Sequence, residues 1–214
     1  LLINNSLTNF KKHINTLMND DSQYSKIGGT RVNQHINSDL KIIKNIIVEN
    51  ISDTISIFLG GGFGRGEGSV LITESKIQPI NDYDIYVITN KKVKSEKIQQ
   101  IRLKLTNLVK IRQIDLDFKT KKSLRFSKKT VANYDLKYAS KFIYGNSNAL
   151  DEIPTFHADE IILKESIIPM NLFLISLIQS YPTVYSEENI FWGKQQISKA
   201  ILGCAMALLI LEKK

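Results

Sequence analysis

The chain has 214 residues, of which 43% are hydrophobic, and its formal net charge at pH 7 is +8. A chain of this length buries one sizeable core or two smaller ones. One cysteine and three histidines exclude a disulfide framework and a zinc cluster, so we expect a reducing compartment, and the positive charge either suits a polyanionic partner or serves solubility.

The N-terminal part of the sequence predicts two helices separated by a loop. Apolar residues recur at helical spacing from Leu7 to Leu17 and again from Ile36 to Ile47, and residues 19–29 between them are polar and contain glycine. Residues 55–59 form a compact apolar run that ends in glycine, as expected of a strand. We therefore expect an N-terminal helical extension over residues 1–35 and a second domain from residue 36.

Strands and helices alternate in the middle of the chain. Residues 84–89 and 114–118 have the composition of strands, and residues 95–109 between them have helical spacing. This order predicts an α/β domain over residues 36–148. Strand signals fade after about residue 150, where residues 158–180 and 187–211 are predicted to be helical. We expect residues 149–214 to form a smaller helical domain.

The last predicted helix carries an apolar stripe, which indicates a core or interface face. Its members are Ile197, Ile201, Cys204, Leu208 and Leu211. The longest apolar run, residues 200–211, is too short to cross a hydrocarbon layer of about 30 Å, and no secretory signal is visible. We therefore expect a soluble, cytoplasmic protein with no membrane partner. Because the chain begins without methionine and stops directly after this stripe, we also expect it to be truncated at both ends.

A glycine-rich loop follows the first predicted strand. The segment IFLGGGFGRGEGSV, residues 57–70, holds six of the chain's 11 glycines. Glycine lets a backbone approach a ligand with no Cβ between them, so the loop amides can bind phosphate; the alternative is a tight strand-to-helix turn. Neither the G-x-G-x-x-G nor the P-loop pattern is present. Arg65 either neutralises a triphosphate or pairs with Glu67 on an exposed turn.

Two predicted strands carry pairs of aspartates at alternate positions. Asp82 and Asp84 lie at the start of one strand, and Asp115 and Asp117 lie in the next. Alternate residues of a strand share a face, so each pair of carboxylates projects to one side. Like charges this close are costly unless they are solvated or share a cation, and hard oxygen ligands suit Mg²⁺. The pattern therefore predicts a metal site, with an exposed strand end as the alternative.

Together, GGFGRGE, DYDIYV and QIDLDF resemble the nucleotidyltransferase superfamily typified by DNA polymerase beta, over roughly residues 36–120. The resemblance implies a mixed sheet flanked by helices, of the α/β (α+β) class, followed by a helical domain. Matched by position, Gly61 and Gly62 are the loop pair and Asp82 and Asp84 the metal-binding pair. The third carboxylate is Asp115, with Asp117 as the alternative. Gly62 stands where many relatives have serine, and residues 70–79 are expected to be an insertion.

The resemblance also implies an activity. Asp82, Asp84 and Asp115 would hold two Mg²⁺ ions, or Mn²⁺ in their place, while a nucleoside monophosphate passes from a triphosphate such as ATP to a hydroxyl acceptor and pyrophosphate leaves. The acceptor class, whether small molecule, nucleic acid or protein, is left open, as is the oligomeric state. The alternative is an inactive nucleotide- or nucleic-acid-binding module of the same fold.

Additional nucleotide-binding residues are expected beyond the motifs. The loop would contribute Gly61, Gly62, Gly64 and Arg65. Lys137 and Lys141, one helical turn apart in YDLKYASKFIYG, would reach a triphosphate if that segment is helical. A run of basic residues after the third aspartate is either a solvated face or a groove for a polyanionic acceptor. It consists of Lys119, Lys121, Lys122, Arg125, Lys128 and Lys129.

Overall fold

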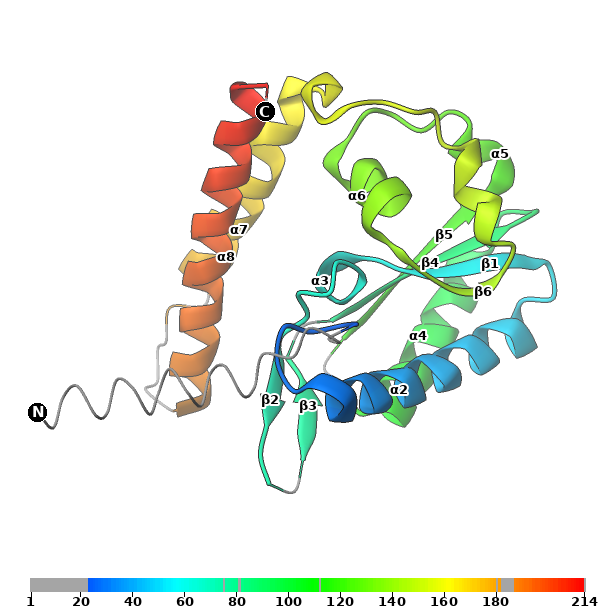
Figure 1. Cartoon of the computed structure of the whole chain (residues 1–214), viewed down its shortest axis with the longest axis horizontal. Helices are drawn as coiled ribbons and strands as arrows, with labels where there is room; N and C mark the ends of the chain where they lie inside the picture. The colour runs from blue at the N-terminus through cyan, green and yellow to red at the C-terminus, as the bar shows by residue number, and fades with distance from the viewer. Residues whose placement is uncertain are drawn as a thin grey trace, which may run out of the picture. The chain divides into compact units, whose positions relative to one another are not determined.

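The computed structural model describes residues 23–213 except residues 75, 81, 112, 180 and 182–186. The expected helix over residues 7–17 lies outside the described residues. Contacts divide the chain into two compact units (Figure 1). The sheet unit comprises Leu1–Ser127 with Asp135–Pro154, and the helical unit comprises Lys128–Tyr134 with Thr155–Lys214. These bounds differ from the ranges expected from the sequence, because residues 29–35 belong to a long helix of the sheet unit and residues 128–134 group with the later helices.

A four-stranded mixed sheet forms the centre of the sheet unit, in the order β5-β4-β1-β6. β4 and β5 are parallel, whereas β1 is antiparallel to both β4 and β6. The expected α+β class with a mixed sheet and flanking helices is confirmed. The four strands are β1 (Thr54–Leu59), β4 (Tyr83–Thr89), β5 (Ile114–Thr120) and β6 (Lys141–Gly145).

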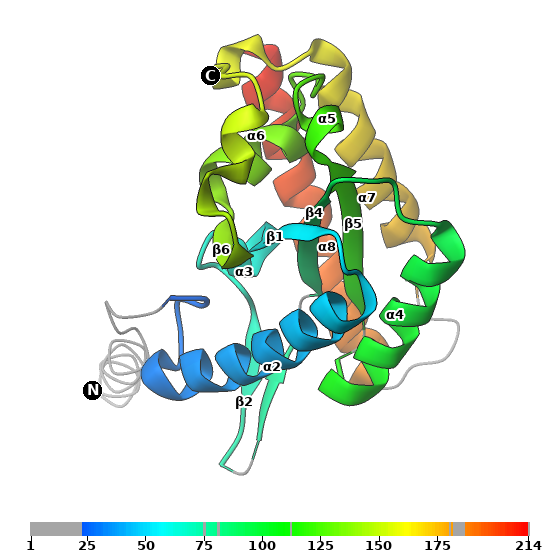
Figure 2. The same ribbon diagram turned by 90° about the vertical axis from the view of Figure 1, so that its right-hand side faces the viewer.

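Two helices cover one face of this sheet and bury the core (Figure 2). They are α2 (Gly29–Asn50) and α4 (Ser95–Val109). Ile36, Ile43 and Ile47 of α2 are fully buried, as helical spacing of apolar residues requires. Ile57 and Ile85 project from the neighbouring strands β1 and β4 into the same cluster. The opposite face of β4 is left for the polar residues of the motifs.

The expectation of a helix through Lys141 is wrong. Helix α6 spans Val131–Ala139, and residues 141–145 form β6 instead. The strand is placed by pairing with β1, with Leu59 opposite Lys141 and Phe58 opposite Phe142. This long-range pairing overrides a local pattern that fits a helix equally well.

Short elements connect the sheet to the rest of its unit. The expected insertion at residues 70–79 is a two-stranded hairpin, β2 (Val70–Ile72) and β3 (Ile77–Pro79). The glycine loop contains a single helical turn, α3 (Gly61–Gly64). A second short helix, α5 (Lys121–Leu124), follows β5, and a 3₁₀ segment, η1 (Ser147–Glu152), follows β6.

The helical unit is built on a pair of packed helices, α7 (Ile167–Gln179) and α8 (Glu187–Leu211). The helix expected over residues 158–180 begins only at residue 167, because two 3₁₀ turns precede it, η2 (Ala158–Glu160) and η3 (Leu163–Ser166). α8 packs on α7, with Gly203 directly against the ring of Phe173. The apolar stripe from Ile197 to Leu211 is exposed rather than part of the described core.

Residues 193–211 of α8 are long and apolar enough to cross a bilayer, judged by length and composition alone. Among the described residues, this is the one helix segment that meets both criteria.

Candidate active site

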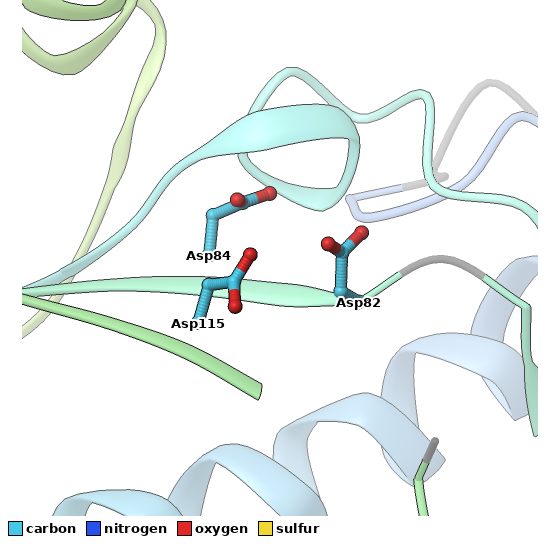
Figure 3. A group of neighbouring side chains, drawn as sticks. All are labelled: Asp82, Asp84 and Asp115. Atoms are coloured by element: carbon cyan, nitrogen blue, oxygen red, sulfur yellow. The ribbon is translucent and has the colours of Figure 1, made fainter. Parts of the chain in front are cut away.

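Three carboxylates meet on one side of strands β4 and β5. Asp84 lies in β4 directly opposite Asp115 in β5, because the parallel register pairs these two residues. Asp82 stands immediately before β4 and projects to the same side as Asp84 (Figure 3). One carboxylate oxygen from each residue lies within 4.8 Å of the others. The spacing of the two motifs in the sequence therefore becomes a compact acidic group in space.

This acidic group has the chemistry of a divalent-cation site. Carboxylate oxygens are the ligands that Mg²⁺ and Mn²⁺ prefer, and three of them at this separation can share one or more cations. The side-chain amide of Gln113 donates a hydrogen bond to Asp115 Oδ1 at 2.8 Å, which leaves Oδ2 of that residue for a cation. Asp82 and Asp84 are both partly buried, so their mutual repulsion is screened less than on an open surface.

Asp117 lies one row further along the sheet. It pairs in register with Tyr86 rather than with Asp84, and Lys119 lies 3.0 Å from its Oδ2. Asp117 is not one of the three residues whose oxygens lie within 4.8 Å of one another. Among the two residues proposed for the third carboxylate, the geometry thus favours Asp115.

The pKa of Tyr86 reflects both its burial and the negative charge on this face of the sheet. Burial of its hydroxyl raises the pKa of Tyr86 to about 12, and the carboxylates of Asp84, Asp117, Asp135 and Asp115 contribute to the shift. The tyrosine therefore stays protonated at neutral pH. Asp135, in α6, belongs to the same acidic environment although it is distant in sequence. Nothing in its local pattern separates it from an ordinary helical aspartate.

The glycine loop lies directly against Asp84. The backbone N–H of Gly60 donates to the carbonyl oxygen of Asp84 at 2.8 Å, which continues the β1–β4 pairing beyond the end of β1. Gly61 has a φ of 58°, and a Cβ there would collide with the Asp84 carboxylate. Only glycine permits both this conformation and this approach. The loop backbone and the acidic group are thus neighbours, through Asp84.

Most of the loop glycines have a reason within the fold. A Cβ would meet the Tyr86 ring at position 60, the Leu59 carbonyl at position 64 and the Phe63 ring at position 68, and Gly66 has a φ of 77°. Gly62 differs, because the nearest atom to a Cβ there is Gly68 Cα at 3.7 Å, an ordinary contact. The first amides of α3 also have no intrahelical acceptor by helix geometry. The space that a side chain at position 62 would occupy is therefore open to a ligand.

Arg65 is held by two carboxylates. One guanidinium nitrogen lies 2.6 Å from Asp135 Oδ2, and Nε lies 3.1 Å from Glu67 Oε2. Burial raises the pKa of Asp135, and the charge of Arg65 offsets part of that shift. The local pair with Glu67 considered from the sequence is present, and Asp135 adds a long-range partner. The remaining nitrogen of the guanidinium fork can still face an anion.

The two lysines expected at the nucleotide lie on either side of Ala139, whose carbonyl oxygen would be 3.3 Å from a Cβ on Gly64. Lys137 donates a hydrogen bond to the carbonyl oxygen of Ile153 and lies 5.8 Å from the centroid of the Tyr138 ring. Lys141 pairs with Leu59, which belongs to the core-facing row of β1. Asp84 lies in the alternate row, so the strand register separates Lys141 from the acidic group.

Ion pairs neutralise much of the basic run after β5. Lys119 pairs with Asp117, Lys129 with Glu160, and both Lys121 and Arg125 with Glu152. Because these pairs are largely exposed, each contributes little to stability. They nevertheless reduce the positive field that a groove for a polyanion needs.

A hollow lies at the acidic group, and a larger one adjoins it on the α4 side of β5. The first, of about 210 Å³, is lined by Asp84, Tyr86, Asp115 and Asp117, and the larger one, of about 610 Å³, lies between α4 and β5. Arg102 of α4 lines both hollows. Its Nε is buried without a hydrogen-bond partner among the described residues, while Nη1 donates to Gln99. The sequence gives no signal for Arg102, since it is one of many basic residues.

Comparison with known proteins gives distant structural similarity. No protein-family model matches the chain, and no curated protein matches it. A solved mutant MntA-HpeT toxin–antitoxin structure is 18% identical, covers 53% of this chain and 77% of its own, and has a TM-score of 0.37. A tri-AMPylated HEPN toxin of Shewanella oneidensis in complex with an MNT antitoxin gives 13% identity, coverages of 82% and 94%, and a TM-score of 0.35.

A toxin–antitoxin structure with AMP-PNP is 16% identical, covers 81% of this chain and 95% of its own, and has a TM-score of 0.35. These low values leave the geometry of the site as the basis for assigning a function.

Proposed function

We propose that this protein is a metal-dependent nucleotidyltransferase that moves a nucleoside monophosphate from a nucleoside triphosphate to a hydroxyl acceptor. The observation that carries the proposal is the group of three carboxylates within 4.8 Å of one another, from two adjacent strands. The backbone of the glycine loop lies against one of them. A phosphate-binding backbone next to a divalent-cation site is the arrangement that phosphoryl chemistry requires.

Asp82, Asp84 and Asp115 would hold the cation or cations, with Mg²⁺ as the expected ion and Mn²⁺ as a substitute. When bound, the ions would neutralise the triphosphate and lower the pKa of the acceptor hydroxyl. In the reaction, the acceptor oxygen bonds to the α-phosphorus, the bond from that phosphorus to the bridging oxygen breaks, and pyrophosphate leaves. The proton of the acceptor hydroxyl passes to water or to the departing pyrophosphate.

The two substrates would bind on opposite sides of Asp84, the triphosphate at the glycine loop and the acceptor at the edge strand. Gly61, Gly62 and Gly64 would present backbone to the triphosphate on the β1 side of Asp84, and the third guanidinium nitrogen of Arg65 would contact a phosphate oxygen. Asp115 lies on the other side of Asp84, in the outermost strand β5. The smaller hollow, which is lined by Asp84, Asp115 and Arg102, is therefore the proposed acceptor side. Lys137 and Lys141 would act only after a rearrangement.

The test is a transfer assay with each of ATP, GTP, CTP and UTP labelled at the α-phosphate, in Mg²⁺, Mn²⁺ or EDTA. Pooled sugars, aminoglycosides, RNA and proteins serve as acceptors, and both pyrophosphate and labelled product are measured. We expect metal-dependent release of pyrophosphate by the wild type and by Asp151→Asn, a matched substitution at an exposed position, but not by Asp84→Asn. Nucleotide binding without pyrophosphate release would instead identify an inactive binding module.

A further inference from the structure

A buried carboxylate lies beneath the site, on the core side of the sheet. Asp39 of α2 is only 7% exposed, and the hydroxyl of the fully buried Tyr83 donates to its Oδ2 at 2.8 Å. His35 Nε2 lies 3.7 Å from the same oxygen. Burial raises the pKa of Asp39, and the hydrogen bond from Tyr83 and the neighbouring His35 oppose that shift. A carboxylate in a core is unfavourable unless it is paired, so this arrangement needs a purpose.

Tyr83 occupies the position between the two metal-binding residues of the first motif. Because side chains alternate along a strand, Tyr83 points to the core while Asp82 and Asp84 point to the site. Tyr83 is also the first residue of β4, where it pairs with Ile114 of β5. Pairing of β4 with β1 begins only two residues later, at Ile85. At the start of β4, among the described residues, only the bond from Gly60 to the Asp84 carbonyl comes from the β1 side, and Asp82 precedes the paired residues altogether.

Tyr83 also contacts the glycine loop. The ring of Phe63, in α3, packs against the ring of Tyr83 with centroids 5.0 Å apart. Phe63 is fully buried, and Gly68 closes over its ring so tightly that a Cβ would collide with it. One tyrosine therefore touches the helix α2 through its hydroxyl and the phosphate-binding loop through its ring. Tyr83 is also the sequence neighbour of both Asp82 and Asp84 of the metal site.

We propose that the Asp39–Tyr83–Phe63 cluster is a positioning device that fixes the metal-binding carboxylates relative to the glycine loop. The inference rests on the proposed function, because it concerns the same site. Asp39 and Tyr83 are positioning residues, since they lie on the core side and reach the site only through the backbone of β4. Residues that orient metal ligands from outside the coordination shell commonly change metal affinity by 10-fold to 100-fold when they are replaced.

A purely structural role predicts a different arrangement. A core needs only shape and apolar surface, and replacing a buried polar pair by apolar residues of similar volume is often neutral or stabilising. A hydrogen bond with one permitted geometry instead fixes orientation at the start of the strand. Loss of this bond should therefore affect the metal site more than it affects the fold.

The test compares Tyr83→Phe with Tyr24→Phe. Tyr24 is the matched control, because it is also buried and its hydroxyl donates to a residue of the same helix, Asn37, at 2.7 Å. Mn²⁺ affinity is measured by calorimetry and by electron paramagnetic resonance, and folding by thermal unfolding in EDTA. We expect the Mn²⁺ dissociation constant to rise about tenfold or more in Tyr83→Phe and to stay within about twofold in Tyr24→Phe.

A second pair of variants removes dependence on Tyr83→Phe. Asp39→Asn keeps an acceptor of the same shape and should rescue most of the Mn²⁺ affinity that Asp39→Leu loses. Unchanged Mn²⁺ affinity in Tyr83→Phe or Asp39→Leu, or an equal loss in Tyr24→Phe, would overturn the inference. Failure of the wild type to bind Mn²⁺ would overturn the proposed function itself, and wild-type Mn²⁺ binding separates the two results.

Discussion

The three carboxylates at the start of β4 and β5 repel one another when no cation is present. Asp84 is the central member, because it faces both Asp115 across the strands and the backbone of Gly61. A neutral amide at this position relieves the repulsion but cannot replace the charge that holds a cation.

Asp84→Asn is therefore expected to lower turnover by about 10²-fold or more, comparable to the loss of another strongly electrostatic catalytic group. Its thermal stability in EDTA should equal or exceed that of the wild type. Adding Mn²⁺ should raise the melting temperature of the wild type, because a ligand that binds only the native state stabilises it, and should leave that of the variant unchanged. A variant with full pyrophosphate release would contradict the assignment.

Asp115 and Asp117 can be separated by the same substitution. Asp115→Asn removes a member of the acidic group and should reduce turnover by about 10²-fold or more. Asp117→Asn removes an aspartate that is 52% exposed and paired with Lys119, so its effect should be much smaller. Steady-state rates of pyrophosphate release decide between them, and the opposite ranking would assign the third carboxylate to Asp117.

Gly62→Ala is expected to leave the melting temperature close to that of the wild type, since the added methyl group has room in the free protein. Affinity for a nucleoside triphosphate with Mg²⁺ should fall, because the methyl group then stands between the ligand and the loop amides. Gly64→Ala is the informative contrast, because its Cβ would lie 2.5 Å from the Leu59 carbonyl oxygen and should destabilise the fold. Calorimetry and thermal unfolding of both variants measure the two effects; undiminished affinity in Gly62→Ala would reduce the loop to a tight turn.

At the scale of elements, Glu152 joins η1 to α5. Its carboxylate accepts two hydrogen bonds from Arg125 and lies 3.2 Å from Lys121 Nζ. Hydrogen bonds from Arg125 and then Lys121 lower the pKa of Glu152 from 4.5 to about 2. A carboxyl group with a lowered folded-state pKa stabilises the fold above its unfolded-state pKa and loses that effect as the pH falls.

We therefore expect Glu152→Gln to melt at a lower temperature than the wild type at pH 7. The difference should shrink as the pH falls below about 4.5 and disappear only below about pH 2, where both states are protonated. Glu74→Gln, at an exposed glutamate of the β2–β3 hairpin, controls for the substitution itself. A difference between Glu152→Gln and the wild type that is independent of pH would contradict the ion-pair interpretation.

The sequence predicts elements well where periodicity is strong. Strands β1, β4 and β5 and helices α2, α4 and α8 lie where the apolar patterns indicate them. The sequence does not predict strand β6, because residues 141–145 become a strand only through pairing with β1. The local pattern of residues 134–145 fits one continuous helix, which would place Lys137 and Lys141 one turn apart. Helix α6 instead ends at Ala139, before Lys141. Local spacing cannot report such long-range pairing.

The site shows the same limit. The two aspartate motifs and the loop follow from the sequence because each is a local signal on one strand or turn. Asp135, Arg102 and the buried Asp39 required the fold, since each reaches the site or its supporting layer from a different helix. Isolated charged residues on helices carry no signal of this kind.

On the scale of the whole molecule, the positive net charge is opposite in sign to the local charge at the site. The chain carries +8, yet Asp84, Asp115, Asp117 and Asp135 all act on the hydroxyl of Tyr86. Near β5, Lys119 pairs with Asp117, and Lys121 and Arg125 share Glu152. An unaccompanied triphosphate would therefore meet like charges at the site despite the positive total.

Removal of divalent cations should for this reason weaken nucleoside triphosphate binding by at least about tenfold, equivalent to about 1.4 kcal/mol. Calorimetry in Mg²⁺ and in EDTA at constant ionic strength measures the change. Asp84→Asn should bind equally with and without Mg²⁺. Strong binding of the wild type in EDTA would show that backbone and Arg65 suffice without a cation.

Selection for protein abundance and selection for activity should act on different positions of the glycine loop. Among the six glycines of residues 60–68, all of which the structure describes, five are fixed by a close contact or a positive φ, and Gly62 is not. In a library that replaces each residue of this loop, selection for abundance alone should accept alanine or serine at position 62 and reject both at the other five. Selection for activity should act on position 62 as well, so the gap between the two profiles would mark where the ligand, rather than the protein, determines the residue.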